Sequence, residues 1–262
     1  MAGRLKDKVA IVTGAASGIG KAIAHAFADE GANIAVVDLQ EAKGQSVVKS
    51  IKDKGRKCIF VKANVSESQE VAMMITEVVR QLGSLNIMVN NAAIIRQASL
   101  LDTTDDIWDL ILKNNLRSCF LCSRESAKVM IRQGRGGNII NISSIHAILS
   151  EPSACAYTAA KGGIEAFSRT IATELAPHKI RVNYIRPGAT YTELTIPMYT
   201  ESVKRALFTR VPMKEIAQPE WIASVAVFLA SDDSRYMTGE GITVDGGYVM
   251  DGSLPGATYW EK

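Results

Sequence analysis

The sequence predicts a doubly wound α/β sandwich, in which helices cover both faces of one parallel sheet. Seven short runs rich in β-branched residues recur along the 262 residues and alternate with longer segments of helical period. Strand followed by helix, repeated along a chain, is the pattern of a parallel sheet. The runs at 9–12 and 34–37 are apolar at every position, as expected for strands that are buried on both sides.

Each element follows from its place in this alternation. The first strand, at 8–13, leads through a glycine-rich loop into a helix at 19–30, and the second strand, at 33–37, is followed by an aspartate. Helices at 41–54 and 67–82 carry charged faces and lie before and after a third strand at 57–63. The remaining predicted elements are strands at 86–90, 138–142, 180–185 and 242–245 and helices at 116–133 and 154–176.

The alternation is not interrupted by a linker, an internal repeat or a low-complexity segment. Residues 1–262 are therefore predicted to form a single domain. The polar, methionine-containing segment 189–218 breaks the rhythm before the last strand, and long excursions of this kind are usually lids or binding loops. Residues 248–262 form a C-terminal tail, and we expect its Tyr259 and Trp260 to pack across a subunit interface.

Composition and charge exclude several classes of protein. Hydrophobic residues make up 47% of the chain and charged residues 22%, which fits an ordinary globular protein and excludes a disordered one. The formal net charge is +3 without a basic cluster, so nucleic acid is not an expected partner. No apolar run is long enough to cross a bilayer and no secretory segment opens the chain, which predicts a cytoplasmic protein without membrane contact. The four cysteines are interpreted as small buried residues, and no metal is expected.

A glycine-rich loop opens the first helix with the spacing G-x-x-x-G-x-G, set by Gly14, Gly18 and Gly20. Such glycines let the backbone approach a pyrophosphate, which accepts hydrogen bonds from the free N–H groups of the helix. Three glycines are also compatible with a purely structural turn. Asp38, 18 residues after Gly20, favours nucleotide binding, because a carboxylate at the end of the second strand accepts both hydroxyl hydrogens of an adenosine ribose. A solvated strand end is the alternative for Asp38.

The charge of Asp38 indicates NAD instead of NADP, since a carboxylate repels a 2′-phosphate. Neither residues 15–17 nor Leu39 supplies an arginine or lysine that would compensate for this charge. The segment 90–93, Asn-Asn-Ala-Ala, closes the fourth strand, where a polar side chain can tie neighbouring strands and small residues leave room for a ribose. A simple Asn-Asn turn is the alternative.

Tyr157 and Lys161 lie four residues apart in a predicted helix, so both side chains share one face. A tyrosine hydroxyl has a pKa near 10, and a neighbouring ammonium can stabilise the phenolate. Ser143 and Ser144 lie at the carboxyl end of the fifth strand, where ligands bind in open α/β sheets and a hydroxyl can hydrogen-bond a developing alkoxide. The tyrosine and lysine alone are more typical of a helix surface, but their coincidence with the other motifs on one edge favours a catalytic site.

With these motifs the chain resembles the classical short-chain dehydrogenase/reductase family, from about residue 8 to residue 247. The resemblance implies a Rossmann-type fold, a nicotinamide cofactor and hydride transfer from a secondary alcohol without a metal. It implies that Tyr157 is the general acid/base, that Lys161 lowers the pKa of Tyr157 and holds the nicotinamide ribose, and that Ser144 polarises the substrate oxygen. Asn115, chosen over the adjacent Asn114 from the leucine that follows, matches the family asparagine that kinks a helix and holds a water.

The resemblance also assigns residues to NAD. The segment that starts at Pro187-Gly188 matches the one that fixes the nicotinamide carboxamide, with Thr190 and Thr192 as contacts. Three positions depart from the family pattern: Asn64 replaces an aspartate that binds adenine, Ala93 a glycine, and Thr190 an isoleucine or valine. The Asn64 side-chain oxygen is expected to accept the same hydrogen bond. The predicted NAD-binding residues are Gly14, Ser17, Gly18, Ile19, Gly20, Asp38, Leu39, Asn64, Val65, Asn91, Ala92, Tyr157, Lys161, Pro187, Gly188, Thr190 and Thr192.

The substrate is predicted from fewer residues. Ser144, His146, Arg96 and Tyr191 are candidate contacts, although His146 also fits a packing role at the rim and Arg96 could pair with an acidic group. A Ser-Ser-Ile-His segment and a tail with Trp260 resemble the glucose and other aldose 1-dehydrogenases of the family. The first hypothesis is therefore an NAD-dependent dehydrogenase of a sugar, polyol or related alcohol.

Two alternatives stay open. A 3-oxoacyl-thioester reductase is disfavoured by Asp38, because such enzymes more often resemble NADP users. A non-catalytic NAD-binding regulator is disfavoured because the whole acid/base set is present. The resemblance further implies a homotetramer built on the helices at 116–133 and 154–176.

Overall fold

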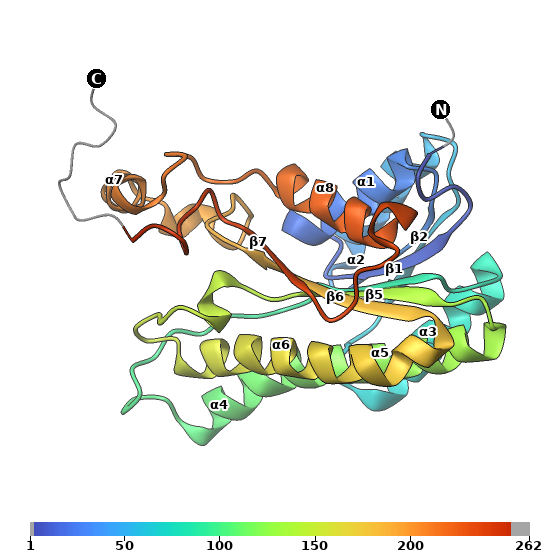
Figure 1. Ribbon diagram of the computed structural model, residues 1–262, viewed down its shortest axis with the longest axis horizontal. Helices are drawn as coiled ribbons and strands as arrows, with labels where there is room; N and C mark the ends of the chain where they lie inside the picture. The colour runs from blue at the N-terminus through green and yellow to red at the C-terminus, as the bar shows by residue number, and fades with distance from the viewer. Residues whose placement is uncertain (1–2, 253–262) are drawn as a thin grey trace.

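The apolar runs of the sequence form one seven-stranded parallel sheet (Figure 1). The computed structural model describes residues 3–252. The strand order is β3-β2-β1-β4-β5-β6-β7, with all neighbouring pairs parallel. The predicted doubly wound, Rossmann-type fold is confirmed. The strands are β1 (Val9–Thr13), β2 (Asn33–Asp38), β3 (Cys58–Lys62), β4 (Ile87–Asn90), β5 (Gly137–Ile142), β6 (Ile180–Pro187) and β7 (Gly241–Val244).

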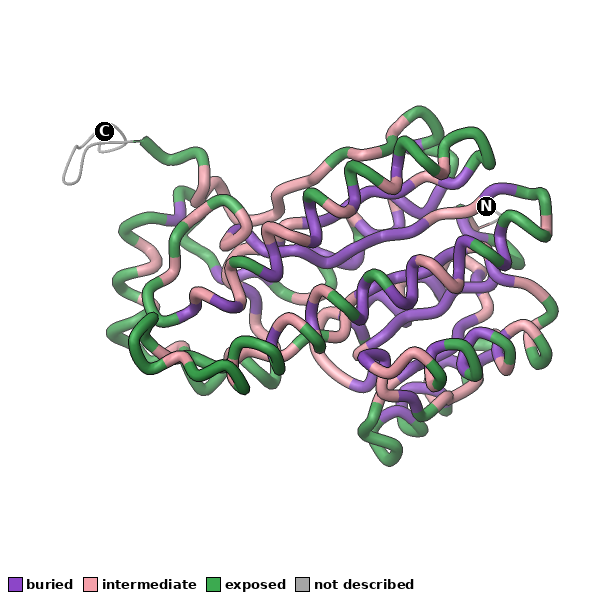
Figure 2. Tube along the Cα trace, turned by 90° about the horizontal axis from the view of Figure 1, so that it is seen from below, coloured by how far each residue is buried: buried purple, intermediate pink, exposed green. Residues whose placement is uncertain are grey.

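Helices cover both faces of the sheet, and the central strands between them are mostly buried, whereas β7 at one edge is half-buried (Figure 2). Successive residues of β1 show why its sequence is apolar throughout: Ala10 and Val12 pack into one core, and Val9 and Ile11 into the core on the opposite face. One face is covered by α1 (Gly18–Asp29), α2 (Glu41–Lys52) and α8 (Pro219–Ala230), and the other by α3 (Ser68–Leu82), α5 (Ser118–Gln133) and α6 (Cys155–Leu175).

α8 lies beside α1, so segments from opposite ends of the chain are neighbours (Figure 1). The buried side chains of α8 include Ile222, Ala226 and Val227 and join the same core as Ile23 and Phe27 of α1. The sequence does not predict α8, because its residues are apolar on nearly all sides and therefore show no helical period.

Two further helices are not predicted. α4 (Asp105–Leu112) begins after Thr104, whose hydroxyl accepts a hydrogen bond from the N–H of Ile107, and continues through a π-helical turn, Lys113–Arg117, into α5. The predicted helix at 116–133 is thus the second part of a longer one. α7 (Glu201–Arg210) lies within the insert at 189–218 and buries no side chain, so its sequence does not show the apolar face that would predict a helix. Single 3₁₀ turns occur at Ile145–Ala147, Ala176–His178, Ile196–Met198 and Asp232–Ser234.

Because all strands run the same way, their carboxyl ends meet at one edge of the sheet, and the predicted site residues follow these ends. Residues 253–262, with Tyr259 and Trp260 of the predicted tail, lie outside the described residues. Between residues 3 and 252, none of the helices has the length and apolar character needed to cross a membrane.

Candidate functional site

The glycine loop after β1 is packed too closely to accept side chains at Gly14 and Gly20. A Cβ on Gly20 would lie 2.3 Å from the Gly14 carbonyl oxygen and 2.5 Å from Nδ2 of Asn91, and Gly14 and Gly18 have φ of +63° and +52°. Ser17 precedes α1 without a side-chain capping bond, so the N–H groups at the first turn, which holds Gly18, Ile19 and Gly20, are available to an anion. These are the features that a pyrophosphate needs, and the loop fits a dinucleotide.

Asp38 lies at the end of β2, beside this loop. Its Oδ2 accepts a hydrogen bond from the Ala16 N–H at 3.0 Å, and its Oδ1 accepts one from the Gln40 N–H at 2.9 Å. The carboxylate is half-buried, and Leu39 beside it is exposed. The structure therefore brings Asp38 and the glycine loop together, as the sequence predicts for a site that holds an adenosine ribose.

The two asparagines at the end of β4, its last residue Asn90 and the following Asn91, connect strands instead of forming a simple turn. Asn90 donates through Nδ2 to the Asn141 side chain of β5 at 2.7 Å. Asn91 donates through Nδ2 to the carbonyl oxygens of Thr13 and Gly14, and the Thr13 hydroxyl accepts the N–H groups of Asn91 and Ala92. The end of β4 is in this way fixed against the glycine loop.

Asn64 differs from its predicted state. Its Oδ1 accepts hydrogen bonds from the N–H of Ser66 at 3.1 Å and from the Ser66 hydroxyl at 2.9 Å, while the N–H of Asn64 donates to Glu70. The oxygen that was expected to accept from adenine is already used twice within the chain, because an asparagine at this position can close a local turn. Val65 follows, nearly buried against the core of the α3 face.

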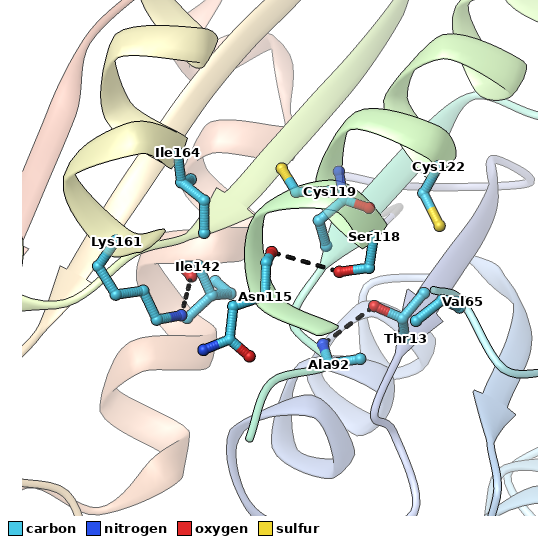
Figure 3. Close-up of a pocket in the computed structure, with 11 residues that line it drawn as sticks. Thr13, Val65, Ala92, Asn115, Ser118, Cys119, Cys122, Ile142, Lys161 and Ile164 are labelled. Atoms are coloured by element: carbon cyan, nitrogen blue, oxygen red, sulfur yellow. Dashed lines mark hydrogen bonds between the residues drawn. The ribbon is translucent and has the colours of Figure 1, made fainter. Parts of the chain in front are cut away.

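Lys161 is buried and points to the carboxyl end of β5, where its Nζ donates to the Ile142 carbonyl oxygen at 2.8 Å (Figure 3). The same Nζ lies 5.5 Å from the centre of the Tyr157 ring. Burial lowers the pKa of Lys161 to about 8. The spacing of four residues thus brings the two side chains together, as predicted.

The pKa of Tyr157 moves opposite to the expectation. Burial raises the pKa of the phenol, and the group that lowers it in part is the Ser144 hydroxyl, not the Lys161 ammonium. The sequence shows that the lysine and tyrosine share a helix face, but it does not show how far the fold removes the tyrosine from solvent. Burial thus favours the protonated phenol of Tyr157, next to Ser144.

Asn115 lies in the π-helical turn and is buried, whereas Asn114 is half-buried. Its amide pairs with the backbone of Ile94: Oδ1 accepts from the N–H at 2.8 Å and Nδ2 donates to the carbonyl at 2.9 Å. A cavity of about 10 Å³ lies next to Asn115 and Lys161, with Thr13 on its other side (Figure 3). This volume is close to the smallest that holds one water.

The segment after β6 is folded onto itself. The Thr195 hydroxyl donates to the Thr190 carbonyl at 2.5 Å and lies 2.9 Å from the Thr192 hydroxyl, and the Tyr199 hydroxyl accepts the N–H of Thr190. Thr192 is close enough to the glycine loop that a Cβ on Gly18 would lie 3.2 Å from it. Thr195 and Tyr199 were not predicted, and the threonine spacing is the one signal for them.

The candidate substrate residues each contact different neighbours. His146 follows Ser144, whose Oγ accepts its N–H, and its Nδ1 lies 3.7 Å from the Glu151 carboxylate; burial lowers its pKa. Tyr191 packs edge-on against Tyr199 at 5.5 Å between ring centres. Arg96 is exposed and donates to the Ile95 carbonyl.

A family model described as "Enoyl-(Acyl carrier protein) reductase" matches residues 14–249. The chain belongs to the classical short-chain dehydrogenase/reductase family. A 3-oxoacyl-[acyl-carrier-protein] reductase, FabG, of Staphylococcus aureus is 39% identical over 244 residues, which cover 93% of this chain and 98% of the relative.

Two solved structures of this family are also similar. A putative short-chain alcohol dehydrogenase from Sinorhizobium meliloti has a TM-score of 0.91 and 34% identity, and the match covers 94% of this chain and 98% of that one. A putative gluconate dehydrogenase from Agrobacterium tumefaciens has a TM-score of 0.91 and 30% identity, with coverage of 95% and 98%. As a short-chain dehydrogenase/reductase, the protein is an oxidoreductase that binds a nicotinamide cofactor. Its resemblance to aldose 1-dehydrogenases stays a prediction.

Proposed function

We propose that the protein transfers a hydride between NAD and a substrate that interconverts between a secondary alcohol and a ketone. The observation that carries this proposal is the meeting of the half-buried Tyr157, Ser144 and Lys161 beside a loop that fits a dinucleotide. When bound, NAD would supply the hydride acceptor and NADH the hydride donor. The proton and the substrate oxygen are handled by side chains of this chain.

In the direction of reduction, Tyr157 donates its hydroxyl proton to the substrate oxygen, which Ser144 also hydrogen-bonds. Burial supports this role because it keeps the phenol protonated at neutral pH. In the direction of oxidation the Tyr157 phenolate accepts the proton, and the Ser144 hydroxyl stabilises this phenolate by a hydrogen bond. Asn115 and Lys161 border the small cavity, where one water would connect the site to the π-helical turn that holds Asn115.

NAD is proposed as the cofactor on the evidence of Asp38. Its carboxylate lies at the glycine loop and carries a negative charge where a 2′-phosphate would come. The residues proposed to hold NAD are those predicted from the sequence, with Asn64 contributing less than expected because its Oδ1 is already bonded to Ser66.

The names of the relatives favour a 3-oxoacyl thioester as substrate over a sugar or polyol. Three exposed apolar side chains of the insert, Leu194, Ile196 and Met198, also suit an acyl chain better than a sugar. The structural neighbour named as a putative gluconate dehydrogenase supports the sugar-derived alternative. We therefore place the thioester first and the sugar or polyol second.

Initial rates with NADH and an acetoacetyl thioester, and with NAD and a panel of aldoses, polyols, hydroxysteroids and hydroxy acids, test the proposal. Tyr157→Phe is expected to lower turnover by 10² to 10⁴-fold. Tyr236→Phe, at a fully exposed tyrosine, is the matched control and should not change it. Retention of more than about a tenth of the turnover by Tyr157→Phe would contradict the acid/base role. Binding of NAD without turnover of any substrate would favour the regulator.

A homotetramer is proposed from α5 and α6, the two helices on which the family resemblance places the subunit contact. α4, α5 and α6 border an open groove of about 850 Å³ with Leu110, Phe120 and Phe167 among its lining residues, which suits an apolar contact with a second copy of the chain. The single domain and the cytoplasmic location are likewise kept as predictions. Sedimentation of the purified chain would measure the assembly.

A further inference from the structure

A buried ion pair lies directly behind the proposed catalytic residues. Both oxygens of the Glu165 carboxylate bond to the Arg186 guanidinium, to Nε and Nη2 at 2.7 Å each. The Glu165 side chain is 5% exposed and that of Arg186 16% exposed. Oε1 of Glu165 also accepts the Ser143 hydroxyl at 2.9 Å. Such two-pronged pairs between arginine and a carboxylate fix direction as well as distance.

The pair lies at the carboxyl end of the pairing between β5 and β6. The last residues in register between β5 and β6 are Ile142 and Ile185. The next residue on each strand is Ser143 and Arg186, and both bond to the same carboxylate oxygen of Glu165. Glu165, on α6 one turn after Lys161, therefore bonds side chains from both strand ends, next to the backbone bond from the Ser143 N–H to the Ile185 carbonyl at 2.8 Å.

The residues that follow these two are those proposed to act on the ligands. Ser144 follows Ser143, and Pro187-Gly188 follow Arg186. Pro187 has no N–H to donate, and the end of β6 is held to β7 by the bond from the Gly188 N–H to the Val244 carbonyl at 2.9 Å. A Cβ on Gly188 would lie 2.7 Å from that of Asp245, so this segment has little freedom to shift without strain.

Arg186 is itself held in place. Its guanidinium stacks 5.0 Å from the centre of the Tyr184 ring, and the Tyr184 hydroxyl accepts bonds from Arg186 and Arg169. The network therefore reaches from α6 to β6. Stability alone is a weak reason for such a pair, because the cost of burying two charges largely cancels their attraction.

We propose that Glu165 and Arg186 are positioning residues, which set the separation between the Ser144 hydroxyl and the Pro187-Gly188 segment of the nicotinamide site. The inference rests on the proposed function. Displacement of a reacting group by about 1 Å can lower a rate by 10²-fold, so a small opening between β5 and β6 is enough to affect catalysis.

Glu165→Gln and Arg186→Lys test this proposal. Both are expected to lower kcat by 10-fold or more with a smaller change in KM for NADH, whose adenosine half is bound elsewhere. With NADH deuterated at C4, the isotope effect on kcat should rise as hydride transfer becomes limiting. The fluorescence of bound NADH should change, since the nicotinamide is less well held. A merely structural role would lower thermal stability without changing kcat per folded site or the NADH emission.

Arg181→Lys is the matched control, because Arg181 lies at the other end of β6 and also binds buried carbonyls, those of Leu229, Ser231 and Met237. It should lower stability and leave kcat within twofold.

If Glu165→Gln does not fold, the milder Arg186→Lys decides. Variants that match Arg181→Lys in kcat, isotope effect and NADH fluorescence would overturn the inference. If the wild type binds NADH but has no turnover, the proposed function fails, and the fluorescence comparison still decides the inference. Absence of NADH binding would overturn both.

Discussion

Replacement of Asp38 by asparagine should change the cofactor preference of the protein. Unit charges about 4 Å apart repel by about 1 kcal/mol in a water-like environment and by about 4 kcal/mol at the effective dielectric constant of a protein surface. Asp38 is half-buried, so its effect should lie between these limits. The ratio of kcat/KM for NADPH to that for NADH is therefore expected to rise by about 5-fold to 1000-fold.

The substitution also has a cost for folding. Each carboxylate oxygen of Asp38 accepts one backbone N–H, from Ala16 and from Gln40, and an asparagine has one such oxygen. The loss of one bond should lower the free energy of unfolding by about 1 kcal/mol. Initial rates at matched NADH and NADPH concentrations, together with urea unfolding, measure both effects.

Asp53→Asn is the control, because Asp53 is an exposed aspartate at the end of α2 and its loss changes the net charge equally. This variant should keep the wild-type ratio. An unchanged cofactor ratio in Asp38→Asn, or a wild type that uses NADPH as well as NADH, would refute the electrostatic reasoning.

Three further predictions concern the glycine loop, the buried lysine and the thiols. Gly20→Ala should weaken NADH binding by more than 100-fold in a fluorescence titration, because its Cβ would lie 2.3 Å from a carbonyl oxygen of the loop. Burial lowers the pKa of Lys161 to about 8, below its ordinary 10.5, so the unfolded chain binds more protons between these values. The unfolding free energy should therefore rise by about 2 kcal/mol from pH 8 to pH 10 through this group, as measured by urea unfolding. Burial raises the pKa of Cys58 and Cys119 to about 12, so a thiol reagent should modify the half-buried Cys155 first and those two after unfolding.

Controls separate these effects from general damage. Gly162 lies inside α6, and in Gly162→Ala the new Cβ would lie 3.7 Å from the Ala147 carbonyl oxygen, an ordinary contact distance. This variant should therefore keep NADH binding and raise stability by about 0.5 to 1 kcal/mol. Lys161→Met should reduce the rise in stability with pH, and an equal rise in both proteins would contradict the assignment. Rapid modification of Cys119 in the folded protein would contradict its burial.

The sheet and the nucleotide end could be predicted because their signals are local. An apolar run such as that of β1 reports burial on both faces, and Gly20 and Asp38 stand at fixed distances along the chain. α7 has no buried side to give a period, and α8 is apolar on nearly all sides, so neither has the pattern of an amphipathic helix.

The pairing of side chains from distant segments could not be read in the same way. The spacing of Tyr157 and Lys161 gives a shared face but not the burial that raises the pKa of the phenol. The meeting of Glu165 with Arg186 depends on the register of β5 against β6, which no local pattern encodes. Asn64 is a case in which a local residue type misleads. Its side-chain oxygen was predicted to be a free hydrogen-bond acceptor, but the hydroxyl of the nearby Ser66 already donates to it.

The packing of α8 beside α1 has a consequence for biosynthesis. α1 leaves the ribosome early, but part of the apolar surface around Phe27 has its partner in Ile222 and Ala226, which are made about 200 residues later. Until then the nascent sheet has an uncovered face, of the kind that chaperones bind and that promotes aggregation. A chain released before residue 219 would keep this surface exposed, so completion of the fold is tied to completion of translation.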